Sequence, residues 1–247
     1  VEVTRRPVVA ILGSGDELVD LDRFHEVLAG RKIVTSNSYT ISALVRSNGG
    51  VARLLGNAAD TPESLRALLE QTKGVDLIVT SAGASVGAFD YTRDVLASLG
   101  ATLDFWKVRM RPGAPVGFGA LHGTPWVGLP GNPVSVMVTF ELFVRPVLRR
   151  MQGHARLFRH PVPVVLDEPV NLGARLTHFL RGIVRVGEDG RMHARLTGPQ
   201  GSGILTSMAR ANALVVVPEE RARCEAGEVV NALLVSDDAH LAESFSL

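Results

Sequence analysis

Three short segments rich in glycine and serine each follow an apolar run with the composition of a β-strand. They are Gly13-Ser14-Gly15, Ser81–Gly87 and Pro130–Ser135. Small residues let the backbone approach a ligand closely, and backbone amides can bind anionic oxygens. None of the three is specific by itself, because the first lacks the third glycine of a dinucleotide fingerprint and no Gly-Lys-Ser/Thr phosphate loop occurs. A tight turn explains any one of them equally well.

Acidic residues accompany these loops. Asp16 and Glu17 follow the first loop, Asp60 precedes a helix start and Asp90 follows the second loop. Carboxylates beside phosphate-binding loops are a common way to hold Mg²⁺, because the ligand's own oxygens complete the coordination. Helix-start polarity would also explain Asp60, and a helix cap would explain Asp90, whereas Glu17 within an apolar run is harder to explain structurally. The pattern therefore indicates a Mg²⁺ site among these carboxylates.

Basic residues alternate later in the chain. Lys107, Arg109 and Arg111 come just before Pro112-Gly113. Such an alternation usually marks the solvated face of a strand. Beside carboxylates and glycine loops, it indicates instead the clamping of an oxyanion.

The elements that would position these residues are alternating strands and helices. Strands are expected at 8–12, 51–55, 76–80, 102–106, 116–118 and 126–129. Helices are expected at 39–47, from Thr61-Pro62 onward, near 91–99, and from Pro133, capped by Asn132, to about Arg150. This alternation is typical of a three-layer α/β domain with a mostly parallel sheet, whose ligands bind at the carboxyl ends of the strands. All three loops fall at such ends.

The pattern changes after Gly153. Short strands are expected at 161–166, 179–186, 192–196, 213–217 and 228–235, separated by turn signals such as Glu188-Asp189-Gly190. They predict a small β-rich, barrel-like domain with mostly antiparallel pairing. The expected domains are therefore residues 1–153 and 154–247.

Composition excludes several classes of function. The 247 residues carry 26 basic and 25 acidic side chains, so the net charge of +1 argues against a nucleic-acid partner. With Cys224 as the one cysteine, no intrachain disulfide and no cysteine-based zinc site can form. No apolar run is long enough for a membrane span, and the first residues form no signal core, which predicts a cytoplasmic protein without a membrane partner. The chain begins without Met, and we expect that it is either a fragment or a protein that works with fewer domains.

Several strings, taken in order, resemble the molybdopterin molybdenumtransferase family, which includes the E domain of gephyrin. In the first domain the strings are Ser14-Gly15-Asp16-Glu17-Leu18, Ser36-Asn37-Ser38-Tyr39, Ser81-x-Gly83-x-Ser85-Val86-Gly87, Phe89-Asp90-Tyr91-Thr92, Phe105-Trp106-Lys107-Val108 and Gly128-Leu129-Pro130-Gly131-Asn132-Pro133-Val134-Ser135. Fainter matches follow at Phe179-x-Arg181-Gly182 and Gln200-Gly201-Ser202. The resemblance thus covers almost the whole first domain and continues into the second.

The resemblance implies a reaction in molybdenum-cofactor biosynthesis. An enzyme of this family takes adenylated molybdopterin and molybdate, releases AMP with the help of Mg²⁺, and works as a homodimer. It implies that Glu17, Asp60 and Asp90 are acidic site residues that hold Mg²⁺ or position water, and that Lys107 and Arg111 are basic site residues. The ligand would be bound by residues of the three loops, namely Gly13, Ser14, Gly15, Ser81, Gly83, Ser85, Gly87, Pro130, Gly131, Asn132 and Ser135.

This chain departs from the family pattern in three places. The usual Lys-Pro-Gly-Lys is Arg111-Pro112-Gly113-Ala114, the usual Ser-Gly-Gly-Val-Ser is changed at Ala82 and Ala84, and the stretch 20–31 lacks the usual prolines and glycines. Family members also carry two further N-terminal domains, so the resemblance does not imply that this chain is active alone. Ala114 favours an alternative, a non-catalytic molybdopterin-binding or scaffold module. A molybdopterin adenylyltransferase is the other alternative, which the added β domain disfavours.

Overall fold

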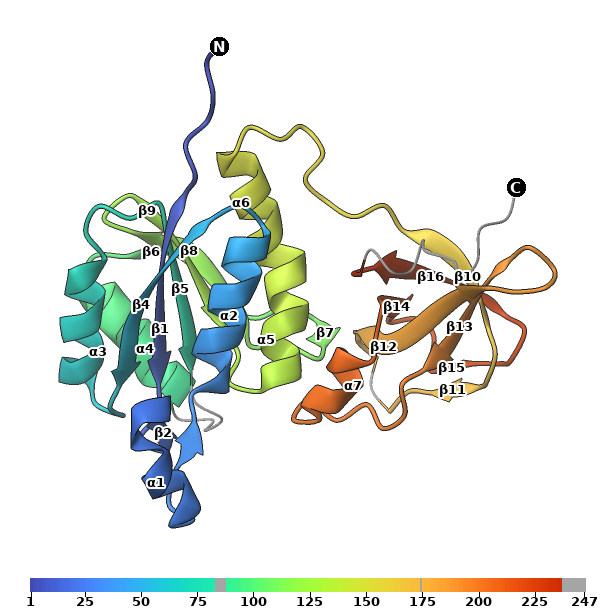
Figure 1. The fold of residues 1–247 in the computed structure, drawn as a ribbon, viewed down its shortest axis with the longest axis horizontal. Coiled ribbons are helices and arrows are strands. Elements are labelled where there is room, and N and C mark those ends of the chain that lie inside the picture. The colour runs from blue at the N-terminus through green and yellow to red at the C-terminus, as the bar shows by residue number, and fades with distance from the viewer. Residues whose placement is uncertain (83–87, 174, 237–247) are drawn as a thin grey trace. The chain divides into compact units, whose positions relative to one another are not determined.

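The computed structural model describes residues 1–82, 88–173 and 175–236, except for the side chains of 82 and 88–91. The chain forms two compact units (Figure 1). Unit 1 comprises residues 1–108 and 113–157, and unit 2 comprises residues 109–112 and 158–247. The domain boundary expected between residues 153 and 154 stays a prediction. No helix among the described residues is long and apolar enough to cross a membrane.

Unit 1 is built on a six-stranded sheet. Its strand order is β4 (Val51–Ala58), β1 (Val8–Ser14), β5 (Leu77–Ala82), β9 (Thr124–Leu129), β8 (Gly117–Leu121) and β6 (Thr102–Phe105). The first four strands pair in parallel and the last two pair antiparallel. The prediction of a mostly parallel sheet is therefore confirmed.

Helices cover both faces of this sheet (Figure 1). On one face lie α2 (Ser36–Ser47) and a continuous helical segment made of α5 (Pro133–Thr139), a π-helical turn η3 (Phe140–Val144) and α6 (Arg145–Met151). On the other face lie α3 (Pro62–Leu69), continued by η2 (Glu70–Thr72), and α4 (Ala88–Ser98). In β1, Val9 and Ile11 pack into the first core while Ala10 and Leu12 pack into the second. A strand buried on both faces is continuously apolar, which is the reason for the run at 8–12.

The helix starts follow capping chemistry. The Thr61 hydroxyl accepts a hydrogen bond from the Ser64 backbone N–H at 3.2 Å, and Pro62 occupies the first helical position of α3, as expected. Asn132 does occupy the N-cap position of α5, but its side chain makes no capping hydrogen bond. The expected helix position is correct at this second site, whereas the Asn132 side chain does not cap it.

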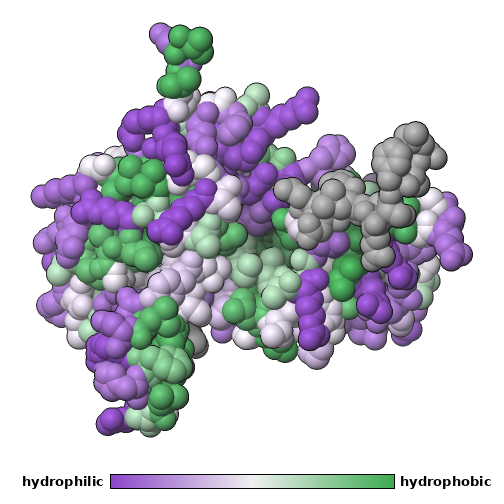
Figure 2. All heavy atoms as spheres, in the orientation of Figure 1, coloured by the Kyte–Doolittle hydropathy of each residue, from purple (hydrophilic) through white to green (hydrophobic). Residues whose placement is uncertain are grey.

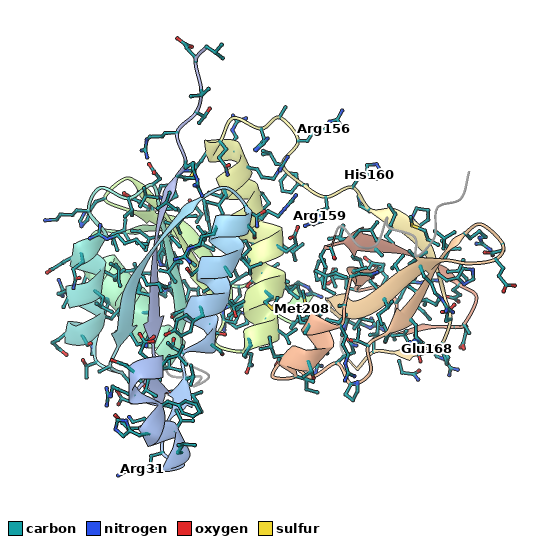
Figure 3. All side chains as sticks on the ribbon, in the orientation of Figure 1. Arg31, Arg156, Arg159, His160, Glu168 and Met208 are labelled. Carbon is teal, nitrogen blue, oxygen red and sulfur yellow. The ribbon has the colours of Figure 1, made fainter. Side chains whose placement is uncertain are left out.

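Residues 18–34 form a small projecting segment that the hydrophobic pattern did not predict. It contains β2 (Leu18–Val19), the single turn η1 (Leu21–Arg23), α1 (Phe24–Leu28) and β3 (Ile33–Val34), with β2 and β3 paired in parallel. Figure 2 shows apolar side chains on its surface, where Leu21, Phe24, Leu28 and Ile33 are exposed. Arg31 lies at its far end (Figure 3). Two-residue strands carry too little alternation to be recognised in a sequence.

Unit 2 is a closed five-stranded barrel. Its strands run in the order β13 (Met192–Leu196), β10 (Val162–Leu166), β16 (Val229–Leu234), β14 (Ala213–Val217) and β12 (Thr177–Val186), and β12 pairs back with β13. The short strand β7 (Met110–Arg111) adds to β12 in parallel. A second small sheet joins β11 (Val170–Asn171) to β15 (Arg223–Cys224), and α7 (Leu205–Ala209) precedes β14. The barrel-like fold expected from the sequence is confirmed.

Candidate functional site

The carboxyl ends of the parallel strands meet at one edge of the unit 1 sheet. Gly13 of β1 is paired with Ser81 of β5, and Ser81 is paired with Leu129 of β9. The chain leaves β1 to form β4 on one side and then returns to form β5 on the other side, so the strand order reverses between β1 and β5. Such a reversal separates the loops at the sheet edge and leaves room for a ligand.

A cavity of about 130 Å³ lies at this edge. Its lining combines the ends of β1, β5 and β9 with the start of α2 and the projecting segment. The lining residues are Gly13, Glu17, Leu18, Ile33, Val34, Thr35, Ser36, Asn37, Ser38, Ser81, Gly131, Asn132 and Pro133. Five of the sequence-predicted site residues, Gly13, Glu17, Ser81, Gly131 and Asn132, are thereby brought together.

Asn37, in the first turn of α2, joins two of the ligand loops. Its Nδ2 donates to the carbonyl oxygen of Gly131 at 2.6 Å and to Oγ of Ser81 at 3.1 Å. Asn37 Oδ1 is buried and has no hydrogen-bond partner among the described residues. One amide thus connects the end of β5 to the loop that follows β9, and its oxygen is left to accept a hydrogen bond from another group.

The predicted acidic residues occupy the loops that follow β1 and β4. Glu17 lines the cavity, and its carboxylate folds over Gly15, where a Cβ would lie only 2.6 Å from Oε2. The φ of 153° at Gly15 favours glycine there, because residues with a Cβ rarely adopt it. Asp60 accepts a hydrogen bond from the hydroxyl of Ser14 at 3.5 Å and one from the backbone N–H of Asp16 at 3.3 Å. Asp60 thus contacts the first ligand loop, while Thr61 provides the cap of α3.

Part of the predicted site lies outside the described residues. Gly83, Ser85 and Gly87 fall in the undescribed stretch, and Asp90 is in α4 with an undescribed side chain. Within the described part of the chain, no three histidine, cysteine or acidic side chains are grouped so that they could hold a metal ion. The metal site of Glu17, Asp60 and Asp90 consequently stays a prediction.

The three alternating basic residues differ in their surroundings. Lys107 lies exposed in the connection after β6 of unit 1, whereas Arg109 and Arg111 belong to unit 2. The Arg109 guanidinium donates to Glu219 at 2.9 Å, which satisfies part of its charge. Arg111 lines a pocket of unit 2. The alternation therefore does not describe one uniform strand face.

This pocket of unit 2 has a volume of about 370 Å³ and contains a buried arginine. Arg181, on β12, is 1% exposed, and its guanidinium donates to Ser207 Oγ at 3.1 Å and to the Gly201 carbonyl at 2.9 Å. Both acceptors are neutral. The pocket is lined by Arg111, Pro112, Pro169, Val170, Asn171, Leu172, Gly173, His178, Leu180, Arg181, Leu196, Gln200 and Gly201.

Electrostatics make Arg181 suited to an anion. Burial lowers the pKa of the Arg181 guanidinium, and no carboxylate of the described residues offsets that effect. An arginine stays charged even so. A buried cation held only by neutral acceptors is stabilised by an anionic ligand. The pocket therefore has the character of an oxyanion site.

Asn37 and Arg181 are two residues with buried polar atoms that the site prediction omitted. Both occur in strings that carried the resemblance, Ser36-Asn37-Ser38-Tyr39 and Phe179-x-Arg181-Gly182. The sequence signal that could have found them is a polar side chain, within a matched string, that is not needed to form the helix or strand in which it lies. Their burial and partners, which distinguish them from their neighbours, depend on contacts far away in the chain.

Two family descriptions match this chain. Residues 10–150 match the "Probable molybdopterin binding domain", and residues 163–235 match the "MoeA C-terminal region (domain IV)". The first match contains every residue that lines the cavity of unit 1, from Gly13 to Pro133. The second contains Arg181 and the other barrel strands.

The curated relatives and the solved structure that match this chain carry names from molybdopterin biosynthesis. A molybdopterin molybdenumtransferase of Nostoc sp. is 40% identical over 225 residues, which are 88% of this chain and 50% of the relative. One of Haemophilus influenzae is 32% identical over 232 residues, 93% of this chain and 56% of the relative. A crystal structure of a molybdopterin biosynthesis MoeA protein from Pyrococcus horikoshii has a TM-score of 0.72 at 28% identity, covering 93% of this chain and 54% of that one. This chain spans about half the length of these relatives.

Proposed function

We propose that this chain, which belongs to the family of the probable molybdopterin-binding domain, provides the pterin-binding and oxyanion-binding parts of a molybdopterin molybdenumtransferase. The reaction would be the metal-assisted insertion of molybdate into adenylated molybdopterin with release of AMP. The observation that carries the proposal is the cavity at the carboxyl edge of the sheet, where Asn37 joins Ser81 to Gly131. Open α/β sheets bind their ligands at this edge.

The cavity fits one ring system of the ligand. Its volume of about 130 Å³ is well below the roughly 300–1,000 Å³ of pockets that enclose a whole drug-sized ligand. The side chains of Leu18, Ile33, Val34 and Pro133 provide apolar walls that suit a flat ring. The phosphates and the rest of the ligand would then extend along the loops outside the cavity, where backbone amides can bind them.

The pocket of unit 2 would bind the oxyanion. Arg181 is held in place by Ser207 and Gly201, so its orientation is set before a ligand arrives. Arg111 adds a second cation to the same pocket. A fixed guanidinium binds anionic oxygens strongly, because little conformational freedom is lost on binding. Lys107 would add a further cation for the anionic substrates, as the resemblance implies.

The acidic residues fit Mg²⁺ in its usual mode, with one or two carboxylates and the remaining positions filled by phosphate oxygens and water. Glu17 lines the cavity, and Asp60 contacts the loop that follows β1. Asp90 would complete the set. When bound, the ion would neutralise charge on the phosphates, while Glu17 and Asp60 would orient water at the sheet edge.

Assembly and location belong to the same proposal. The homodimer is supported by the family resemblance, and light scattering at several protein concentrations tests it directly. The cytoplasmic location remains a prediction from the sequence. The whole enzyme's activity is likewise proposed, because the relatives are about twice as long as this chain.

A calorimetric titration of residues 1–247 with molybdopterin or adenylated molybdopterin tests the binding site. Gly131→Trp should abolish binding, because an indole would fill the cavity. Glu63→Trp is the matched control, since Glu63 is exposed on α3 and does not line the cavity. If Gly131→Trp and the parent bind equally, the cavity is not the site. Following AMP release with Mg²⁺ and molybdate then separates an enzyme from a binding module, which would bind without releasing AMP.

A further inference from the structure

The orientation of the Asn37 amide is determined by its neighbours. The carbonyl of Gly131 can only accept a hydrogen bond, so the atom that lies 2.6 Å from it must be the amide nitrogen. The second hydrogen of that nitrogen is directed to Ser81 Oγ at 3.1 Å. Both donors of Asn37 are therefore used within the protein, and only its oxygen is left for another partner.

That oxygen is buried without a partner. Asn37 Oδ1 accepts no hydrogen bond from the described residues, although an amide oxygen has two lone pairs available. Buried polar atoms in folded proteins nearly always have a partner, so an unpaired one beside a cavity calls for an explanation. Asn37 lines the cavity at the sheet edge. A ligand that brings a hydrogen-bond donor into this cavity would supply the partner.

The charge of the lining indicates what kind of ligand group enters. Among the residues that line the cavity in the described structure, Glu17 is acidic and none is Lys, Arg or His. A phosphate or molybdate group in this cavity would therefore meet a negative charge and no cation. A ring edge with N–H groups would instead meet two acceptors, the Glu17 carboxylate and Asn37 Oδ1.

We propose that Asn37 is a specificity-determining residue, whose Oδ1 accepts a hydrogen bond from an amino group on a heteroaromatic ring of the ligand. Together with Glu17 it selects a heteroaromatic ring edge that carries N–H donors. This inference rests on the proposed function, because it assumes that the cavity binds part of adenylated molybdopterin. The required edge occurs both in a pterin and in an adenine, so the two rings have to be distinguished by experiment.

Two pairs of probes, each differing at one position, make this distinction by calorimetry. Pterin carries a 2-amino group that lumazine replaces with an oxo group, and AMP carries a 6-amino group that IMP replaces with an oxo group. The protein should bind the amino member of one pair about tenfold or more tightly than the oxo member, since a site built to accept from an amino N–H rejects the analogue whose oxo group at that position can only accept. Preference within the first pair assigns the cavity to the pterin, and preference within the second assigns it to the adenine.

Two variants test whether Asn37 is the cause. Asn37→Ala should bring the ratio of the two affinities in a pair close to one, whereas Asn37→Gln keeps the amide donors and the amide acceptor and should retain part of the preference. Thermal unfolding of each variant controls for the loss of the contacts to Ser81 and Gly131. If Asn37→Ala weakens both members of a pair equally, Asn37 is only a structural link and the inference is wrong. If no probe binds while adenylated molybdopterin does, the ring lies elsewhere and the inference fails while the proposed function stands. If adenylated molybdopterin does not bind either, both fail.

Discussion

Asp16 and Asp60 each accept a hydrogen bond from the other's backbone N–H group. The Asp60 N–H donates to Oδ1 of Asp16 at 3.0 Å, and the Asp16 N–H donates to Oδ2 of Asp60 at 3.3 Å. This reciprocal pair joins the loop that follows β1 to the loop that follows β4. Two carboxylates are thereby held at the sheet edge, close to the residues that line the cavity.

The pair provides a test of the metal site with a built-in control. We expect Mg²⁺ to strengthen binding of adenylated molybdopterin, and Asp60→Asn to remove that enhancement, because the substitution deletes an anionic oxygen while keeping the shape. Asp16→Asn should retain the enhancement, since Asp16 is exposed and is not a predicted ligand. Titrations with and without Mg²⁺ measure the effect, and Asp90→Asn should behave as Asp60→Asn does. If Mg²⁺ enhances binding equally in the Asp16 and Asp60 variants, both residues only hold the two loops together and neither binds the metal.

Arg181 should control the affinity for molybdate. Arg181→Lys keeps the positive charge but loses the fork that binds oxygens in pairs, so molybdate affinity should fall by about 1.5–3 kcal/mol. Arg185→Lys is the matched control, because Arg185 lies on the same strand and pairs with Asp167 at 3.4 Å. Direct titration of molybdate into each variant measures the difference. A comparable loss in the Arg185 variant would mean that the barrel binds anions through its general surface charge.

Lys107 and Arg109 should differ in their effect on anion binding. Lys107→Ala should weaken retention of the anionic substrate by about 1.5–3 kcal/mol, the scale of a hydrogen bond between charged groups. Arg109→Ala should change it little, because the guanidinium of Arg109 is already paired with Glu219. Competition binding at fixed ionic strength checks both variants. The prediction is wrong if the two variants lose the same amount.

Stability of the barrel unit should depend on pH through His193. Its Nδ1 lies 3.0 Å from Asp167 Oδ1, and its Nε2 lies 3.1 Å from Asp189 Oδ1. The hydrogen bond with Asp167, followed by that with Asp189, raises the pKa of His193 above 6.5. The stabilisation is therefore fully present below pH 6.5 and is lost as the pH rises through the raised pKa. Asp189 acts in the opposite sense, since the N–H of Arg191 and then His193 lower its pKa below 3.8.

Denaturant unfolding at a series of pH values tests this dependence. The contribution of His193, Asp167 and Asp189 to the free energy of unfolding should be largest between about pH 4 and 6.5. In His193→Gln, the free energy of unfolding should fall less steeply above pH 6.5 than in the parent. Arg185 and Arg191 are the cations near the same carboxylates, so ionic strength must be held constant. Should His193→Gln decline as steeply as the parent, the pH dependence arises elsewhere in the protein.

The strands of this protein could be predicted because their signals are local. The runs at 192–196 and 213–217 coincide with β13 and β14, and the run at 8–12 lies within β1. A short apolar run bounded by turn residues predicts a strand, because a run of this length is too short for most helices. The same locality explains why the loops at Gly13, Ser81 and Gly131 could be proposed as ligand loops: each directly follows such a run.

Only the tertiary structure decided which side chains from distant segments contact these loops. Asn37 reaches Gly131 across 94 positions in the chain, and Arg109 reaches Glu219 across 110. In the sequence Arg181 resembles any charged residue of a strand, whereas in the folded barrel its side chain is 1% exposed. Burial, and the absence or presence of a partner, arise from the packing of segments that are distant in sequence. Because no local pattern contains that information, the sequence alone determined the strands and the loops that follow them, and the fold determined which side chains line the cavity at their ends.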